Sequence, residues 1–147
     1  AVLRFNFRGV GKSTGEWSGG LGEIDDVGVA MAAAGARYGS AVSLAGWSFG
    51  AAAALRWQAA TASTASYVGI APPVAADLTP ALPPPSELSA ARRCFVLGDR
   101  DQFVTTRELG DYAASIDASL VVLEGSDHFF YLKEREVGEV LADFLTD

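Results

Sequence analysis

The sequence contains little cysteine, histidine or basic charge, and it has no long apolar run. Its single cysteine, Cys94, excludes an internal disulfide. Because this residue opens the apolar run Cys94-Phe95-Val96-Leu97, we expect a buried thiol in a strand. A cysteine nucleophile would need an activating base beside it, and no neighbouring residue supplies one, which argues against thiol chemistry.

The charge and hydropathy of the chain exclude several classes of partner. Eleven basic residues are set against 18 acidic ones, for a formal net charge of −7, and no basic stripe is visible. This pattern argues against nucleic acid as a partner. No apolar run approaches the roughly 20 residues of a membrane span, and no signal segment opens the chain. We therefore expect a cytoplasmic protein that binds neither nucleic acid nor membranes.

Strand-like and helix-like runs alternate along the 147 residues, half of which are hydrophobic. This alternation is typical of a mostly parallel sheet flanked by helices, so we predict one α/β domain over residues 1–147. The proline-rich stretch 72–85 reads as an irregular connection that is too short for a lid domain. The predicted strands are 1–7, 41–46, 65–71, 93–98 and 119–124, and the predicted helices are 22–38, 49–60, 105–117 and 131–146.

The most informative motif is Gly46-Trp47-Ser48-Phe49-Gly50, which lies between an apolar strand-like run and an alanine-rich helix-like run. A G-x-S-x-G pattern at such a junction is typical of a nucleophile elbow, a sharp turn that lifts a serine hydroxyl clear of the sheet. We expect both glycines to be needed because side chains there would collide with the neighbouring strand and helix. The amide of Phe49 would lie at a helix N-terminus, where it can donate to an oxyanion.

A serine nucleophile needs a base, and the base needs a carboxylate that orients it. The only histidine, His128, follows the predicted strand 119–124, and Asp101 follows the predicted strand 93–98. In a parallel sheet these loops and the serine turn all emerge at the carboxyl edge of the strands, where open α/β sheets gather their sites. The order Ser48, Asp101, His128 is also the one expected for this elbow. We therefore predict a catalytic triad of these three residues.

Asp99, in the same loop, is the alternative acid. Asp101 is favoured because it lies further into the loop, where its side chain can reach sideways to the imidazole, whereas Asp99 can brace the turn. Each feature also has a plainer interpretation: a G-x-S-x-G pattern occurs in ordinary turns, a lone histidine is more often structural, and either aspartate can form a turn or a helix cap. The agreement of three loops in the right order favours the catalytic interpretation.

The segment Gly9-Val10-Gly11-Lys12-Ser13-Thr14 resembles the end of a phosphate-binding loop, but two features argue against nucleotide binding. Asn6 occupies the position at which that motif requires its first glycine. Several glycines between residues 15 and 22 prevent a helix from starting at once and presenting its amides to phosphates. We expect no nucleotide, no other cofactor and no metal ion.

Taken together, these residues resemble the α/β-hydrolase superfamily, and within it the small bacterial hydrolases that lack a lid. That group carries Arg-Phe-Asn-Phe-Arg-Gly-Val-Gly-x-Ser, which is found here at residues 4–13, and a Gly-Phe-Ser-Phe-Gly elbow, in which Trp47 replaces the first phenylalanine. It also carries an acid loop like residues 98–101 and a histidine loop like residues 127–130. The resemblance covers essentially the whole chain. The family roles that it implies are nucleophile for Ser48, acid for Asp101 and base for His128.

The resemblance also implies that family members have about three more strands and a helix before the first strand of this chain. In these proteins the loop after the third strand supplies the second oxyanion amide. Their third strand lies in the sheet between the two strands that correspond to residues 1–7 and 41–46 of this chain. Without it, residues 1–7 either pair directly with 41–46 or face an unfilled slot, whose open apolar edge invites another chain. We therefore expect an N-terminally truncated domain, or a homo-oligomer formed through this N-terminal strand edge.

The predicted function is that of a serine hydrolase acting on small carboxylic esters by an acyl-enzyme mechanism. Loss of one oxyanion donor typically costs on the order of 10²–10³ in rate, so we expect feeble catalysis from this chain alone. An amide or peptide hydrolase with the same triad and a non-catalytic binding or assembly module are the alternatives. Trp47, Phe129 and Phe130 either line an apolar acyl pocket or pack around the elbow, and the sequence leaves both open.

Overall fold

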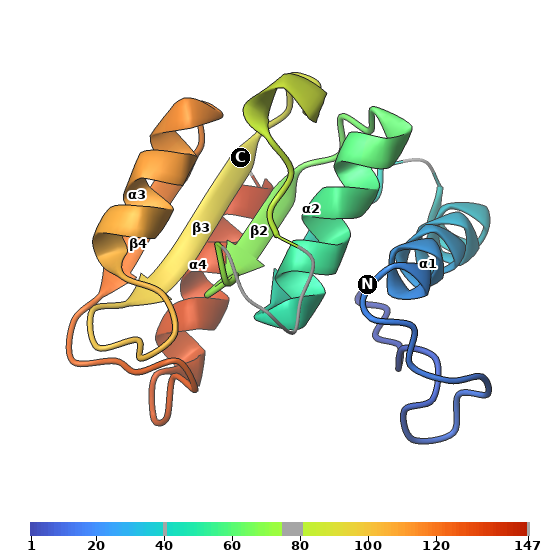
Figure 1. Ribbon diagram of the computed structural model, residues 1–147, viewed down its shortest axis with the longest axis horizontal. Coiled ribbons are helices and arrows are strands. Elements are labelled where there is room, and N and C mark those ends of the chain that lie inside the picture. Colours follow the sequence, from blue (N-terminus) through green and yellow to red (C-terminus); the bar gives the residue numbers. More distant parts are fainter. Residues whose placement is uncertain (40, 75–80, 147) are drawn as a thin grey trace.

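The computed structural model describes residues 1–39, 41–74 and 81–146 (Figure 1). Its strands form one parallel sheet in the order β1-β2-β3-β4. The strands are β1 (Leu44–Trp47), β2 (Tyr67–Ile70), β3 (Arg93–Gly98) and β4 (Ser119–Leu123). The helices are α1 (Gly22–Tyr38), α2 (Phe49–Thr61), α3 (Thr106–Ser115) and α4 (Glu134–Thr146), and Pro85–Glu87 form a 3₁₀ turn. The predicted α/β class, a parallel sheet flanked by helices, is confirmed.

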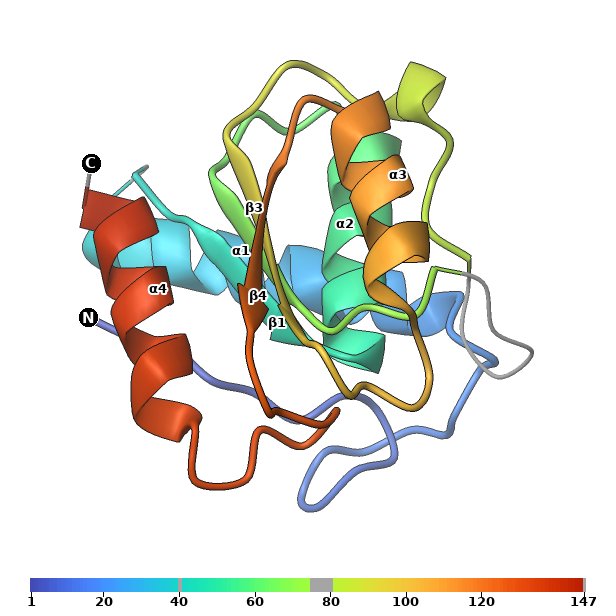
Figure 2. The same ribbon diagram turned by 90° about the vertical axis from the view of Figure 1, so that its left-hand side faces the viewer.

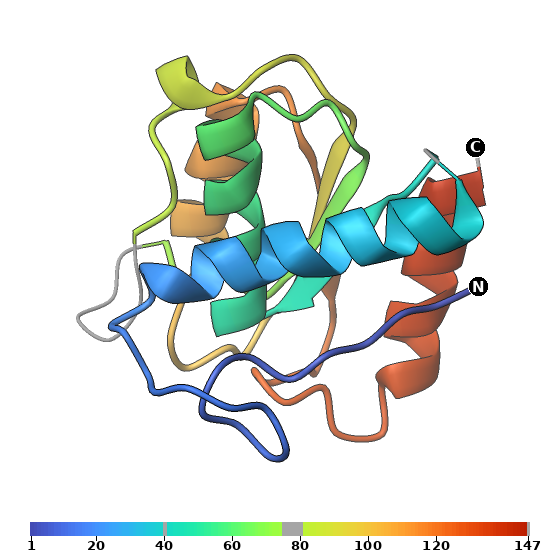
Figure 3. The ribbon, with the colours of Figure 1, turned by 90° about the vertical axis from the view of Figure 1, so that its right-hand side faces the viewer.

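The helices cover both faces of the sheet. Helices α2 and α3 lie on one face and α4 lies on the other (Figure 2). Each strand pairs with the next strand along the chain, and right-handed crossovers between parallel strands then place successive connections on the same face. Helix α1 packs against α2 and runs along the β1 side of the sheet (Figure 3). Because all four strands are parallel, their carboxyl ends lie at the same edge of the sheet.

Strand β3 lies at the centre of the core, and all six of its residues are buried, as expected for a parallel strand covered on both faces. Four consecutive alanines near the start of α2, Ala51 to Ala54, are buried, and their small side chains allow the helix to approach the sheet closely. The hydroxyl of Tyr67 donates to the carbonyl of Ala51 at 2.9 Å and so satisfies a fully buried polar group. Cys94 is only 2% exposed, which confirms the predicted buried strand thiol.

Most predicted elements form, and their ends differ for identifiable reasons. The helix 22–38 and the strand 93–98 have the predicted bounds. The helix predicted to start at residue 131 starts at Glu134, because Phe130 and Leu132 have positive φ angles of 53° and 62° that a helix cannot contain. Thr105 forms a capping box with Glu108, which fixes the start of α3 one residue later than expected.

The strand predicted at residues 1–7 does not form. Ala1–Phe5 instead line a cavity of about 680 Å³ together with Ala41–Trp47, and apolar residues such as Met31 of α1 and Leu141 of α4 complete the lining. An extended segment joins a sheet only where a neighbouring strand lies about 4.8 Å away, and this cavity, called the β1 cavity below, separates the two segments. Of the two arrangements that the sequence left open, the structure has the unfilled slot, and the sheet edge beside this slot is that of β1.

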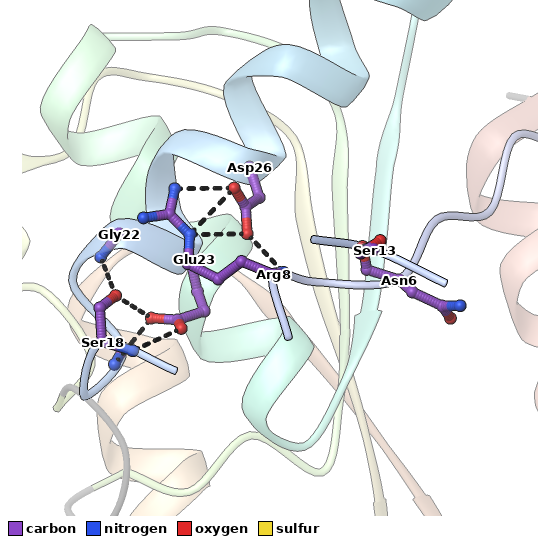
Figure 4. A network of polar contacts seen from close by, with 8 residues as sticks. Asn6, Arg8, Ser13, Ser18, Gly22, Glu23 and Asp26 are labelled. Carbon is purple, nitrogen blue, oxygen red and sulfur yellow. Dashed lines mark hydrogen bonds and ion pairs between the residues drawn. The ribbon is translucent and has the colours of Figure 1, made fainter. Parts of the chain in front are cut away.

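Two carboxylates hold the loop between residues 8 and 22 against the start of α1 (Figure 4). Arg8 donates to Asp26 through its amide at 2.9 Å and its guanidinium at 2.8 Å. The buried Glu23 accepts hydrogen bonds from both the amide and the hydroxyl of Ser18 and from the amide of Gly20, at 2.8–2.9 Å. Burial raises the pKa of Glu23, but these hydrogen bonds outweigh it and hold the pKa below its ordinary value. The loop is thus a braced turn, and no helix begins before Gly22.

Candidate active site

Ser48 forms the sharp turn between β1 and α2. Its φ of 51° and ψ of −120° lie in a strained region for a residue with a side chain. The backbone is held by three hydrogen bonds, from the Ser48 amide to the carbonyl of Ile70 at 2.8 Å and from the amides of Ala51 and Ala52 to the Ser48 carbonyl. A serine at a helix N-cap commonly turns its hydroxyl to the helix amides. Here the hydroxyl makes no such bond, and it remains available for His128.

The two glycines of the elbow differ in what they do. A Cβ on Gly46 would lie 2.5 Å from the carbonyl oxygen of Gly50 and 2.6 Å from the amide of Ala51, so the close approach of β1 and α2 requires glycine there. A Cβ on Gly50 would meet only the ring of Phe7, at 3.9 Å, which is an ordinary contact. The expectation that both glycines avoid a collision is therefore correct for Gly46 and wrong for Gly50.

The imidazole of His128 lies between the other two predicted residues. Its Nδ1 is 2.8 Å from Oδ2 of Asp101, and its Nε2 is 3.0 Å from Oγ of Ser48. An ionised carboxylate only accepts hydrogen bonds, so Nδ1 carries the proton, and Nε2 is left to accept from the serine hydroxyl. The side chains of His128 and Asp101 are 6% and 0% exposed, and this exclusion of water strengthens the contact between them.

The carboxylate of Asp101 makes two kinds of contact, one with the backbone of its own loop and one with the imidazole of His128. Its Oδ1 accepts the amides of Phe103 and Val104 at 2.8 and 3.0 Å, which closes the turn, while its Oδ2 contacts the imidazole. Oδ1 of Asp99 instead accepts the amide of Ser126 at 3.2 Å and braces the histidine loop. The structure therefore brings Asp101, and not Asp99, to His128, as the sequence favoured.

The histidine loop is tied to both neighbouring loops. The amide of His128 donates to the side-chain carbonyl of Gln102 at 3.3 Å, and its carbonyl accepts from the indole Nε1 of Trp47 at 3.1 Å. Gly98 allows the acid loop to approach closely, because a Cβ there would overlap the backbone of Ser126. The position of the imidazole is therefore set both by contacts of the His128 backbone and by contacts of its ring nitrogens.

The three aromatic residues proposed for an acyl pocket do not share one environment. The rings of Trp47 and Phe129 lie 5.7 and 5.5 Å from the imidazole of His128, centroid to centroid, and both are exposed. Phe130 is 4% exposed and belongs to the core, so the packing interpretation holds for this residue. Sequence reasoning missed Phe103, whose ring lies 4.7 Å from the imidazole. Its signal was an apolar residue in a polar loop, two positions after Asp101.

Relatives of known structure share this arrangement of strands and helices. No family model matches the sequence. A serine hydrolase homologue from Coxiella burnetii is 30% identical, with a TM-score of 0.79 over 94% of this chain and 65% of its own. A lidless α/β serine hydrolase from Xanthomonas campestris is 31% identical, with a TM-score of 0.78 over 97% of this chain and 64% of its own. The chain has the fold of the α/β hydrolases, in the form without a lid.

Two further comparisons show how far this likeness extends. An uncharacterized protein of Rickettsia prowazekii (strain Madrid E) is 31% identical over 158 residues, which are 98% of this chain and 64% of that protein. An esterase from Pyrococcus furiosus, at 17% identity and a TM-score of 0.77 over 96% of this chain, shares the fold alone. The chain spans just under two thirds of the length of its Rickettsia, Coxiella and Xanthomonas relatives.

The first turn of α2 offers hydrogen-bond donors beside Ser48. Within the described ranges, the amides of Phe49 and Gly50 donate to no protein acceptor. They lie at the N-terminus of a 13-residue helix, where the helix dipole favours negative charge. No cluster of three or more His, Cys, Asp or Glu side chains that could hold a metal ion occurs among residues 1–39, 41–74 and 81–146. None of the helices described there is both long enough and apolar enough to span a bilayer.

Proposed function

We propose that the chain is a serine hydrolase that cleaves small carboxylic esters through an acyl-enzyme on Ser48. The observation that carries the proposal is the unbroken line of contacts from Asp101 through His128 to Ser48, at 2.8 and 3.0 Å. Its position at the carboxyl edge of a parallel sheet supports a reactive site. The likeness to serine hydrolases at about 30% identity supports the same chemistry.

The reaction begins when Nε2 of His128 takes the hydroxyl proton of Ser48 and Oγ attacks the ester carbonyl. Asp101 holds the imidazole with its protonated nitrogen away from the serine and stabilises the imidazolium that forms. The amide of Phe49, which is free at the start of α2, donates to the oxygen of the tetrahedral intermediate. The imidazolium then gives the proton to the departing alcohol, which leaves the acyl-enzyme. His128 next takes a proton from water, which attacks the acyl-enzyme and releases the acid and the free serine.

Esters are the proposed substrate class because an ester carbonyl is more reactive than an amide carbonyl towards the hydroxyl of Ser48, and the Phe49 amide lies at the helix N-terminus beside it as an oxyanion donor. An oxyanion donor of this kind is worth on the order of 10²–10³ in rate. An accessible site without a lid fits a small acyl group. Hydrolysis of amides or peptides, and a purely binding role for the fold, are the outcomes that the test must separate from this proposal.

The test is hydrolysis of p-nitrophenyl acetate by the wild type and by Ser48→Ala, with Ser115→Ala as a serine control outside the site. We expect Ser48→Ala to fall to the background rate and Ser115→Ala to keep the wild-type rate. A fluorophosphonate probe provides the second readout, and we expect its labelling to need both Ser48 and His128. Equal hydrolysis by wild type and Ser48→Ala, with no labelling, would establish the non-catalytic alternative.

A matched pair of acid variants tests the assignment of Asp101. Asp101→Asn can present its NH₂ group to Nδ1 and so favours the wrong imidazole tautomer, which lowers kcat on the order of 10³–10⁴ in such a site. Asp99→Asn alters a contact to the Ser126 amide and leaves the imidazole partner in place, so we expect a much smaller loss. A larger loss in Asp99→Asn than in Asp101→Asn would reassign the acid.

A further inference from the structure

Three exposed aromatic side chains surround the imidazole of His128. The ring centroids of Trp47, Phe103 and Phe129 lie 5.7, 4.7 and 5.5 Å from it. Each ring comes from a different segment: the end of β1, the acid loop and the histidine loop. Trp47 and Phe129 also contact one another, at 6.1 Å. These three residues are called the aromatic collar below.

The three rings of the aromatic collar are largely exposed to water, unlike the aromatic rings of the core. Trp47, Phe103 and Phe129 are 48%, 64% and 56% exposed, whereas the aromatic pair Tyr67 and Phe95 in the core is fully buried. A contiguous cluster of exposed aromatic side chains on a folded domain marks a surface that binds something apolar. Here the cluster surrounds the one imidazole of the proposed reaction.

Hydrogen bonds hold the Trp47 ring and the backbone at Phe103 and Phe129. The indole NH of Trp47 donates to the carbonyl of His128, which fixes the direction of that ring. The amide of Phe103 donates to Asp101 at 2.8 Å, and that of Phe129 donates to Asp127 at 2.9 Å, so both side chains project from hydrogen-bonded turns. A ring whose direction is fixed in advance, as that of Trp47 is, loses little conformational entropy on binding, and this favours affinity.

The chemistry of the site decides which part of an ester would meet these rings. In acyl transfer, Nε2 of His128 returns its proton to the leaving oxygen, so that oxygen must come within hydrogen-bonding distance of Nε2. The carbon atoms of the alcohol portion then lie against the immediate neighbours of the imidazole, which are the collar. The acyl portion extends from Oγ of Ser48 and the amide of Phe49, on the side of the elbow.

We propose that Trp47, Phe103 and Phe129 form the subsite for the alcohol portion of the ester, and that this portion is an apolar aryl group. The inference rests on the proposed hydrolase function and names its substrate class. An aryl alcohol fits because aromatic rings pair edge to face at centroid distances of about 4.5–7 Å. Two of the residues considered for an acyl pocket, Trp47 and Phe129, thereby become alcohol-binding residues, and Phe103 becomes the most exposed wall.

The test compares two substrate series in the wild type, Phe103→Ala and Phe103→Leu. The alcohol series is phenyl acetate and 2-naphthyl acetate, which share an acyl group and have leaving groups of similar reactivity. The acyl series is phenyl acetate and phenyl butyrate, which share an alcohol. Tyr38→Ala, which removes an aromatic side chain of similar exposure at the end of α1, is the matched control.

We expect Phe103→Ala to lower the ratio of kcat/KM for 2-naphthyl acetate over phenyl acetate about tenfold, the effect of losing roughly 55 Å² of apolar contact. Phe103→Leu should restore most of this ratio because it keeps apolar bulk. The butyrate-to-acetate ratio should stay within twofold of the wild type in all variants. A change in the acyl ratio with a constant alcohol ratio, or no change in either, would overturn the proposal.

A binding measurement separates failure of the subsite from failure of the proposed function. 2-Naphthol, the free alcohol, is titrated into Ser48→Ala and into Ser48→Ala combined with Phe103→Ala, with changes in protein NMR signals as the readout. We expect the second variant to bind about tenfold more weakly. If no Ser48-dependent hydrolysis exists but this difference remains, the hydrolase function fails and the collar stands as a site. If hydrolysis depends on Ser48 but the two variants bind 2-naphthol equally, the collar assignment is wrong.

Discussion

The elbow offers a matched pair of substitutions, Gly46→Ala and Gly50→Ala, that make the same chemical change two residues on either side of the nucleophile. At Gly46 the new methyl group would lie 2.5 Å from the Gly50 carbonyl oxygen and 2.6 Å from the Ala51 amide. Contacts of this kind normally lie near 3.4 Å or beyond, so the start of α2 must move away from β1 by several tenths of an ångström. At Gly50 the nearest atom is a ring carbon of Phe7, at 3.9 Å, and nothing need move.

The magnitudes follow from these contacts. Overpacking of this kind costs about 1–3 kcal/mol, and at Gly46 the colliding atoms are backbone, which cannot rotate away, so we expect the upper half of that range. Gly50 lies inside α2 without a positive φ, and alanine is a better helix former than glycine by up to about 1 kcal/mol. Gly50→Ala should therefore be neutral or slightly stabilising.

Urea unfolding measures both variants. With a urea dependence of about 1–3 kcal/mol per M for a small protein, the midpoint of Gly46→Ala should fall by roughly 1 M with an unchanged slope, while that of Gly50→Ala should stay or rise. The rate of fluorophosphonate labelling is the second readout, because a displaced α2 carries Ser48 away from Nε2 of His128. Equal destabilisation by the two variants, or a greater effect at Gly50, would refute the steric account of the elbow.

Three further predictions concern other parts of the molecule. The pKa of Glu23 is held below its ordinary value of 4.5, so its carboxylate stabilises the folded chain above that value, and this stabilisation is lost as the pH falls through the lowered pKa. The difference in unfolding free energy between wild type and Glu23→Gln should accordingly shrink on acidification; a difference that is constant from pH 7 to 3 would contradict this. Burial raises the pKa of the Cys94 thiol, so native protein should react with DTNB far more slowly than urea-unfolded protein, and equal rates would place the thiol at the surface. The β1 edge and the β1 cavity predict self-association that increases with concentration in light scattering, and a constant monomer mass at all concentrations would argue against it.

Local patterns made much of the fold predictable. Leu109, Tyr112 and Ala113 have the i, i+3, i+4 spacing of one helix face and lie in α3, and the apolar run Cys94-Phe95-Val96-Leu97 lies in β3. Ends of elements were harder, because they depend on single backbone angles. Phe130 and Leu132 adopt positive φ angles that no propensity for these residues would suggest, and they delay the start of α4.

The meeting of the three site residues was predictable because it follows from the topology of the sheet. A parallel sheet sends every βα loop to one edge, so the order of Ser48, Asp101 and His128 along the chain was enough to expect them together. The environment of each aromatic residue was not predictable, because neighbours in sequence face opposite ways. Phe129 projects beside the imidazole and Phe130 enters the core, while Phe103 reaches the same imidazole from another loop.

The sequence by itself determined the α/β class, the elbow and the three residues that meet at it, since each of these depends on local pattern and on the fixed direction of parallel strands. Only the tertiary structure decided the fate of residues 1–7. A strand is defined by a partner and not by its own residues, and across the β1 cavity Ala1–Phe5 have none in the described part of the chain. The tertiary structure also decided that Gly46 is indispensable and Gly50 is not, because only the close packing of α2 on β1 distinguishes them.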